Sequence, residues 1–195
     1  MKEISREFII EVDSRVKKTI KKSRYIHTQG VRFTSAAMAM KHGVDIRSAE
    51  LAGVLHDCAK NLSHKEMEAL CKRHNVEISE AEKKNKELLH AKAGMCLSAE
   101  VYEIDDPDIL NAVKYHTTGR PDMSDLEKIV FIADFIEPGR DKAHCLTEAR
   151  KLAFEDLNKC MYIILKNTLE YLDITGAMVD DITKDALNYY KQYSN

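Results

Sequence analysis

A histidine followed directly by an aspartate, His56-Asp57, interrupts a mostly apolar stretch over residues 50–60. If this stretch is buried, both side chains lose their contact with water, and that loss is costly unless each of them finds a strong partner. A divalent metal ion is a partner that satisfies an imidazole and a carboxylate together. We therefore interpret this pair as metal ligands.

Other ionisable side chains stand in similar apolar surroundings elsewhere in the chain. Asp134 interrupts the run from Ile129 to Ile136, which is too apolar to lie on a surface. Taken alone, a histidine on an apolar face is more often a hydrogen-bonded core residue than a ligand. Several such residues in one chain indicate one shared site. The predicted metal ligands are His27, His56, Asp57, His90, His116 and Asp134.

This ligand set combines imidazole nitrogen with carboxylate oxygen and contains no sulfur. Such a set suits five- or six-coordinate iron, manganese, cobalt or nickel better than a structural zinc ion. Adjacent residues of a helix diverge by about 100°, so His56 and Asp57 can act together only if the helix opens at its end. Asp57 could then bridge two ions, and we expect one or two ions in the site.

Charge and cysteine content narrow the class of protein. The chain of 195 residues carries 30 basic and 32 acidic side chains, so no overall field attracts a nucleic-acid polymer or an anionic membrane. The five cysteines are irregularly spaced and include no Cys-x-x-Cys pair, which argues against disulfides and against a thiolate zinc site. No apolar run resembles a signal peptide or a membrane span. We expect a cytoplasmic protein.

The elements that must position these ligands are predicted to be helices. With only three prolines and seven glycines the chain favours helix, and no segment shows sustained two-residue alternation. Serines followed three residues later by glutamate predict helix starts at Ser63, Ser79 and Ser124, and Gly43 predicts a helix stop. The helices are expected near residues 4–20, 24–42, 45–60, 63–74, 80–102, 107–117, 124–136, 147–173 and 180–193.

These helices are expected to form a single all-α domain over residues 1–195. No Pro-, Gly- or Ser-rich linker divides the chain. The last two helices, within residues 147–193, are expected to pack as a pair on the rest. Amphipathic helices and the aromatic pair Tyr189-Tyr190 also leave room for a homodimer.

The predicted ligands belong to five longer motifs, which are spread over most of the chain. They are Arg24-Tyr-Ile-His27-Thr, Leu55-His56-Asp57-Cys-Ala-Lys60, Leu89-His90-Ala-Lys-Ala-Gly94, Tyr115-His116-Thr-Thr-Gly119-Arg120 and Ala133-Asp134-Phe-Ile-Glu137-Pro-Gly-Arg140. Their order and spacing resemble the HD-domain metal-dependent phosphohydrolases, a helical superfamily. Within it they resemble the YqeK-type proteins, which are bacterial symmetrical dinucleoside-tetraphosphate hydrolases. The Asp-Lys-Ala-His-Cys-Leu segment after Arg140 departs from that family, in which a Pro-Gly is expected.

The resemblance implies a di-iron-type site that cleaves diadenosine tetraphosphate in the middle and releases two molecules of ADP. Iron is the expected metal, with manganese, cobalt and nickel as alternatives. A water activated by the metal would attack phosphorus, so no covalent nucleophile is required. The residues expected to take part in catalysis are Asp57, Lys60, His90 and His116. Those expected to bind the nucleotide substrate are Arg24, Lys60, Thr117, Thr118, Gly119 and Arg140.

Simpler interpretations of the same residues stay open at this point. Basic residues such as Arg24 and Lys60 are common at solvated helix ends, and Thr117-Thr118-Gly119 alone is an ordinary helix stop. Glu137 is either a hydrogen-bond acceptor behind a ligand or a turn residue.

Other activities compete with the tetraphosphate hydrolase. The first alternative is another HD phosphohydrolase acting on nucleoside monophosphates or on guanosine tetraphosphate alarmones. A di-iron oxygenase and a nucleotide-binding module without activity are further alternatives, and a product analysis would separate all of them.

Overall fold

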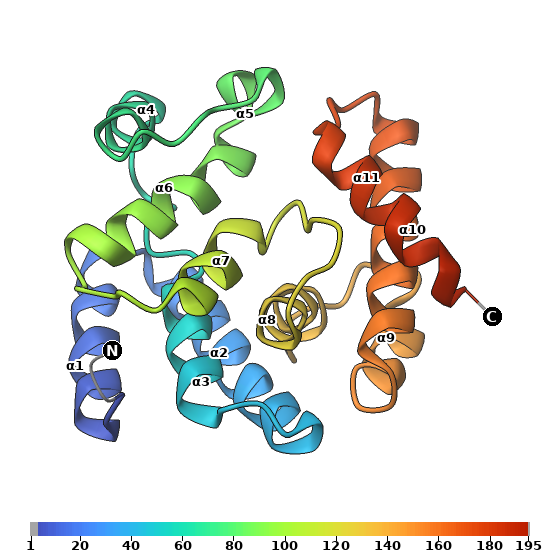
Figure 1. Cartoon of the computed structure of the whole chain (residues 1–195), viewed down its shortest axis with the longest axis horizontal. Helices are drawn as coiled ribbons and strands as arrows, with labels where there is room; N and C mark the ends of the chain where they lie inside the picture. Colours follow the sequence, from blue (N-terminus) through green and yellow to red (C-terminus); the bar gives the residue numbers. More distant parts are fainter. Residues whose placement is uncertain (1–3, 195) are drawn as a thin grey trace.

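Helices make up all the regular secondary structure over residues 4–194, the part of the chain described by the computed structural model (Figure 1). The predicted all-α fold is therefore confirmed. The elements are α1 (Arg6–Thr19), α2 (Lys22–His42), α3 (Ile46–Leu55), α4 (His64–Arg73), α5 (Glu80–Lys84), α6 (Lys86–Glu100), α7 (Pro107–Tyr115), α8 (Asp125–Ile136), α9 (Leu146–Leu152), α10 (Leu157–Thr175), α11 (Asp181–Tyr190) and the 3-10 helix η1 (Lys191–Tyr193). Within this described range no helix is both long and apolar enough to cross a membrane.

Local sequence signals set most of these helix ends. Ser63, Ser79 and Ser124 each accept a hydrogen bond from the backbone N–H three residues on, and the glutamate at that position returns one. These reciprocal bonds satisfy backbone donors that a helix start leaves free. Gly43 ends α2 with a φ of 71°, a left-handed conformation that glycine adopts without steric cost. The predicted starts and the predicted stop are confirmed.

Two predicted long helices are in fact broken. The expected helix 80–102 is interrupted at Asn85, whose extended backbone separates α5 from α6 and whose side chain accepts from the N–H of Glu87. The expected helix 147–173 is interrupted between α9 and α10, where Asp156 caps the new helix through the N–H groups of Asn158 and Lys159. Both interrupting residues bond the backbone more readily at a cap than inside a helix, which explains the breaks.

The prediction of one helix over residues 45–60 is wrong at its end, and this difference matters for the site. Helix α3 stops at Leu55, and the chain continues in tight turns in which the Cys58 N–H bonds the Leu55 carbonyl and the Lys60 N–H bonds the Asp57 carbonyl. His56 and Asp57 therefore lie at an opened helix end. This is the condition under which both side chains can face one centre.

Close packing of α2 against α3 brings two ligand-bearing elements together. A Cβ added at Gly53 would lie 2.8 Å from the Cα of Arg32, so the α3 backbone rests directly on α2 at this point. Helix α8 also packs on α2 and α7 and lies in the middle of the molecule, with its axis toward the viewer in Figure 1. The centre of the fold is thus formed by helices that are distant in sequence.

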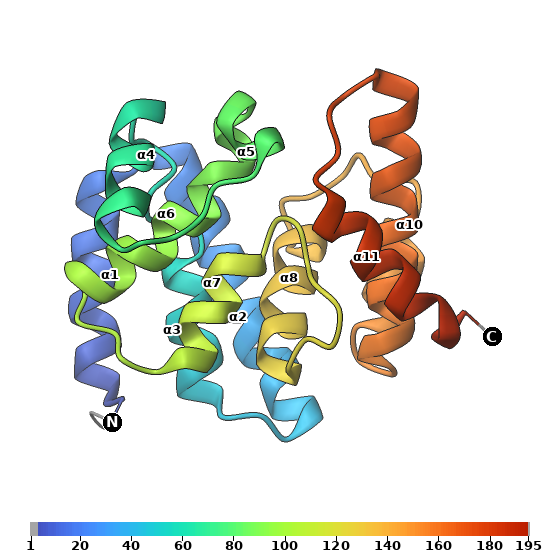
Figure 2. The same ribbon diagram turned by 45° about the horizontal axis from the view of Figure 1, so that its top comes forward.

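The C-terminal helices form a layer on one side of α8, opposite to the side on which α1 lies (Figure 2). Helix α11 packs on α10, as expected for a pair. Tyr190 is buried, and its hydroxyl accepts a hydrogen bond of 3.1 Å from the N–H of Met123. One apolar cluster runs from Ile9 in α1 to Tyr190 in α11. The single domain stays a prediction, which this continuous core favours.

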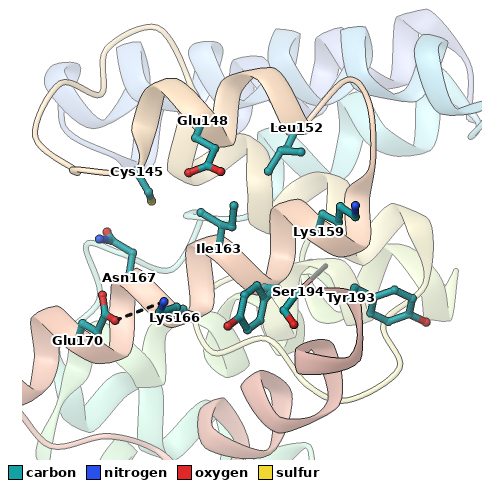
Figure 3. A pocket seen from close by; sticks show the side chains of 11 residues that line it. Cys145, Glu148, Leu152, Lys159, Ile163, Lys166, Asn167, Glu170, Tyr193 and Ser194 are labelled. Carbon is teal, nitrogen blue, oxygen red and sulfur yellow. Dashed lines mark ion pairs between the residues drawn. The ribbon is translucent and has the colours of Figure 1, made fainter.

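A cavity of about 520 Å³ lies within this C-terminal layer, between α9, α10 and the end of the chain (Figure 3). Its lining includes Cys145, Glu148, Lys159 and Tyr193.

Candidate metal centre

The predicted ligands meet at one place, although they come from five helical regions. His27 lies on α2, His90 on α6 and Asp134 on α8, while His56 and His116 directly follow the last residues of α3 and α7. Asp57 follows His56. The structure therefore brings all six predicted ligands together, and His56, Asp57, His90 and His116 are each at most 2% exposed.

Asp57 occupies the middle of the cluster. Its Oδ1 lies 2.9 Å from His90 Nε2 and 3.9 Å from His116 Nε2. Its Oδ2 lies 3.4 Å from His56 Nε2 and 3.9 Å from His27 Nε2. One carboxylate thus faces two pairs of imidazoles, one pair with each oxygen.

Asp134 completes one side of the cluster. Its Oδ1 lies 3.0 Å from His27 Nε2, which is in turn 3.3 Å from His56 Nε2. Two groups of ligand atoms each fit within 4.8 Å: His27, His56 and Asp134 form one, and His56, Asp57 and His116 form the other. Both groups include His56, whose Nε2 can bind a single ion, so they are overlapping arrangements within one cluster.

Backbone carbonyl groups fix the orientation of two of the imidazoles. The Nδ1–H of His56 donates to the Gly53 carbonyl at 2.7 Å, and that of His116 donates to the Val113 carbonyl at 2.7 Å. Because a carbonyl only accepts, each ring carries its proton on Nδ1 and directs the Nε2 lone pair inward. Nε2 is therefore the atom of each ring that can bind a metal.

The titratable groups of the cluster shift one another's pKa values in opposite directions. Burial opposes the charged form of His56, but the carboxylates of Asp57 and Asp134 raise its pKa. Burial and the neighbouring histidines lower the pKa of His116 to about 3, so this ring is neutral at neutral pH. Burial alone would raise the pKa of Asp57 and of Asp134, but hydrogen bonds and charges from the surrounding histidines hold both pKa values well below the usual range. Ionised carboxylates and neutral imidazoles are the forms that coordinate a cation, so the residues fit a divalent metal.

Three basic side chains predicted to bind substrate also lie at the cluster. Arg24 Nη1 is 2.9 Å from Asp57 Oδ2, and Arg140 Nη2 is 2.6 Å from Asp134 Oδ1. Lys60 Nζ is 3.3 Å from both ring nitrogens of His90. The two predicted carboxylate ligands therefore each carry an arginine, and the lysine covers a third ligand.

A cavity of about 560 Å³ adjoins the cluster. His116, Thr117, Asp134 and Arg140 line it. The Thr117 hydroxyl is buried and has no hydrogen-bond partner among residues 4–194. A threonine predicted to bind substrate thus stands beside the ligands with an unused polar group.

Thr118 and Gly119 are not brought to this cavity. The Thr118 hydroxyl donates to the Gly119 carbonyl at 3.0 Å. Gly119 has a φ of 64°, and a Cβ there would meet Phe131, Leu165 and Ala186 at 3.6 Å. Because α7 ends at Tyr115, before the predicted residue 117, the following side chains turn in different directions. Their proposed contact with substrate stays a prediction that this geometry does not favour.

Sequence reasoning missed other residues around the site. Lys60 Nζ pairs with Glu87 Oε2 at 3.0 Å, and neither the type nor the spacing of Glu87 signals this contact. Phe135, Lys142 and Thr168 line the cavity but come from three separate segments. Of these three residues only Phe135 is adjacent in sequence to a predicted ligand, Asp134. That adjacency is the one sequence signal that could have identified it as a residue of the site.

Comparison with known proteins agrees with this geometry. Residues 24–139, which include all six predicted ligands, match the family model described as HD domain. The chain belongs to the HD domain family. The resemblance inferred from the motifs is thereby confirmed.

Related proteins extend the similarity over nearly the whole chain. A protein of Bacillus subtilis (strain 168) named bis(5'-nucleosyl)-tetraphosphatase, symmetrical, is 40% identical over a match covering 80% of this chain and 83% of that protein. A Staphylococcus aureus protein of the same name is 35% identical, with 89% and 90% covered. The crystal structure of a predicted HD superfamily hydrolase involved in NAD metabolism, from Clostridium acetobutylicum, has a TM-score of 0.89 and 38% identity, with 94% and 97% covered.

Proposed function

We propose that this HD-domain protein is a metal-dependent hydrolase that cleaves dinucleoside tetraphosphates symmetrically. Diadenosine tetraphosphate would give two molecules of ADP. The observation that carries the proposal is Asp57, whose two oxygens face two pairs of imidazoles, in a chain 35–41% identical to relatives named for this activity. The adjoining cavity and its basic residues supply a place for an anionic substrate.

The cluster offers ligands for two ions. His27, His56, Asp134 and one oxygen of Asp57 would hold the first, and His90 and His116 with the other oxygen of Asp57 would hold the second. Iron is the proposed metal, with manganese, cobalt or nickel as alternatives that the same ligands accept. A bound transition metal lowers the pKa of water toward neutrality and offsets charge on phosphoryl oxygens.

The basic side chains would bind the tetraphosphate. Arg24 and Arg140 each use one nitrogen on a ligand carboxylate and keep further N–H donors for phosphate oxygens. Lys60 is largely buried between His90 and Glu87. Its ammonium group would stabilise the negative charge that develops on the departing nucleoside diphosphate.

The cavity of about 560 Å³ would hold one nucleoside end of the substrate. Its volume falls within the range of roughly 300–1,000 Å³ that small-molecule sites occupy. Phe131 and Phe135 supply aromatic surface for a base, and Lys142 supplies a positive charge. The unpartnered Thr117 hydroxyl would hydrogen-bond the nucleotide.

Product analysis tests the reaction. Anaerobically purified protein with its native metal, given diadenosine tetraphosphate, should release ADP as the single nucleotide product. Appearance of ATP with AMP would contradict symmetrical cleavage. Orthophosphate or pyrophosphate as the product would favour the other HD phosphohydrolases, and dependence on dioxygen would favour an oxygenase. The nucleotide is the proposed partner, and the homodimer stays a prediction from the sequence.

A further inference from the structure

A buried carboxylate stands behind one of the proposed ligands. Glu137 directly follows α8, is 5% exposed, and has its Oε1 3.1 Å from His27 Nδ1. His27 directs its other ring nitrogen, Nε2, toward Asp134 and His56. Glu137 thus contacts the ring on the side away from the cluster, and it does not itself line the adjoining cavity, although its neighbours Gly139 and Arg140 do.

The helix that carries His27 is shaped to admit this carboxylate. Gly30 lies one turn after His27 in the interior of α2, where glycine destabilises a helix relative to alanine. A Cβ at Gly30 would lie 2.4 Å from Glu137 Oε2 and 3.1 Å from its Cδ. The absence of a side chain at Gly30 therefore leaves the space that Glu137 occupies. This packing explains why a glycine stands inside the helix.

The carboxylate is also held from its own side. Its Oε2 accepts a hydrogen bond of 2.6 Å from the Gly139 N–H. Arg150 of α9 donates to the backbone carbonyls of Ile136 at 3.0 Å, Glu137 at 3.1 Å and Arg140 at 2.8 Å. The turn that presents Glu137 is thereby fixed from both sides.

We propose that Glu137 is a positioning residue that orients His27 for metal binding, with Gly30 providing the space that the carboxylate needs. Accepting the Nδ1–H of His27 fixes the ring tautomer and its rotation, and it makes Nε2 a better donor to a cation. The inference rests on the metal centre of the proposed function. It adds a role for two residues that bind neither metal nor substrate.

Metal titration tests this role separately from turnover. Co²⁺ added to metal-free protein is followed by its visible absorption and by elemental analysis. Glu137→Ala should weaken the ion held by His27 by about 10- to 100-fold and leave the second ion bound. Glu137→Gln, which keeps an oxygen acceptor, should recover part of the affinity. Glu155→Ala removes an exposed acid and serves as the matched control, with no change expected.

A double-mutant cycle separates positioning from a general effect on folding. Gly30→Ala should displace the carboxylate and weaken Co²⁺ binding about as much as Glu137→Ala does, and circular dichroism with thermal melting checks that both variants fold. In the Glu137→Ala background the same Gly30→Ala change should cost little further affinity, since the carboxylate is gone and only the Cβ of residue 137, at 3.3 Å, remains near the added methyl group.

Two results would overturn the inference. One is unchanged Co²⁺ affinity in folded Glu137→Ala and Glu137→Gln proteins. The other is an equal loss from Gly30→Ala in both backgrounds, which would mean that the methyl group acts by another route. A wild-type protein that binds no Co²⁺ would reject the proposed metal centre and this inference together. Wild-type binding with products other than ADP would reject only the proposed reaction.

Discussion

The metal cluster and the C-terminal layer both border cavities of similar size, yet they differ in what lines them. The cavity beside the cluster, of about 560 Å³, contains the buried His116 and the ionised Asp134. The cavity in Figure 3, of about 520 Å³, carries an ion pair between Lys166 and Glu170 at 4.0 Å with side chains 55% and 59% exposed. Cavity volume alone therefore does not separate them.

Burial of charge separates the two regions. An exposed ion pair on one helix contributes about 0.5 kcal/mol or less, because water solvates both partners. Desolvated carboxylates and imidazoles persist only where each has partners, and the cluster provides them on every side. Burial of charge is not confined to the site, because Glu127 of α8 is also fully buried and is paired with Arg120. The cluster differs in that several buried ionisable groups meet at one centre.

The largest expected effect comes from removing the centre of the cluster. Asp57→Ala should lose both ions and lower kcat/KM for diadenosine tetraphosphate by more than about 100-fold, since loss of a shared ligand exceeds the effect of losing a residue behind one. Elemental analysis and product chromatography measure the two losses. Turnover by an Asp57→Ala protein shown to be free of metal would reject the proposed mechanism.

A somewhat smaller effect is expected from the arginines that flank the ligands. Arg140→Ala should lower kcat/KM by about 10- to 100-fold, which corresponds to the loss of about 1.5–3 kcal/mol from charge-assisted hydrogen bonds. Steady-state kinetics at several substrate concentrations measures it. Arg73→Ala removes an exposed arginine paired with Glu100 and should leave kcat/KM unchanged. Equal losses in the two variants would break the distinction between an arginine at the cluster and one elsewhere on the surface.

Thr117 sharpens the comparison within the first cavity. Thr117→Val removes a buried hydroxyl that has no partner in the described chain, so the free protein should gain about 1 kcal/mol of unfolding free energy. If that hydroxyl serves the nucleotide, KM should rise several-fold at the same time. Denaturant unfolding and kinetics on one preparation give both values, and a stabilised variant with unaltered KM would remove Thr117 from the substrate site.

The two regions also differ in cysteine chemistry. Burial raises the pKa of the Cys58 thiol, beside the cluster, to about 12, so it stays protonated at pH 8. Cys145, on the second cavity, is half-buried, and burial raises its pKa as well. Iodoacetamide at pH 8 should label Cys145 slowly and leave Cys58 unlabelled in folded protein, as read by peptide mass spectrometry. Rapid labelling of Cys58 would contradict its burial.

The smallest effect is expected at the rim of the second cavity. Lys166→Ala should change the unfolding free energy by about 0.5 kcal/mol or less and leave KM for diadenosine tetraphosphate unaltered. Thermal melting and kinetics check both values. A clear rise in KM would show that this cavity also serves the substrate, and the contrast between the two regions would fail.

The sequence contained enough information to predict which ionisable residues meet, because each of them conflicted locally with apolar neighbours. Their role as metal ligands stays a prediction. His27 and Asp134, far apart in the chain, could be assigned to one site on that ground alone. Residues whose charge does not conflict with apolar neighbours could not be assigned to the site from the sequence. Glu87 and Lys142 stand in polar segments, and only the packing of separate helices shows what they face.

The fold was also only partly predictable: helix ends with a local capping signal were predicted, and helix ends without one were not. Capping serines and glycines determine helix ends locally, so those ends were predicted. Asn85 ends α5 and begins α6, and Asp156 begins α10 four residues after α9 ends. No proline or glycine stands at either break, so the spacing of apolar residues alone does not reveal it. The opened end of α3 depends on what His56 and Asp57 contact, and a local pattern does not contain that information.

Direct contact between the backbones at Gly53 and Arg32 has a consequence for how the protein acquires its metal. The carbonyl of Gly53 also accepts the hydrogen bond from His56 Nδ1, so one residue sets both the spacing of α2 and α3 and the orientation of the His56 ring. Preorganisation of this kind means that an arriving ion needs little rearrangement of the polypeptide.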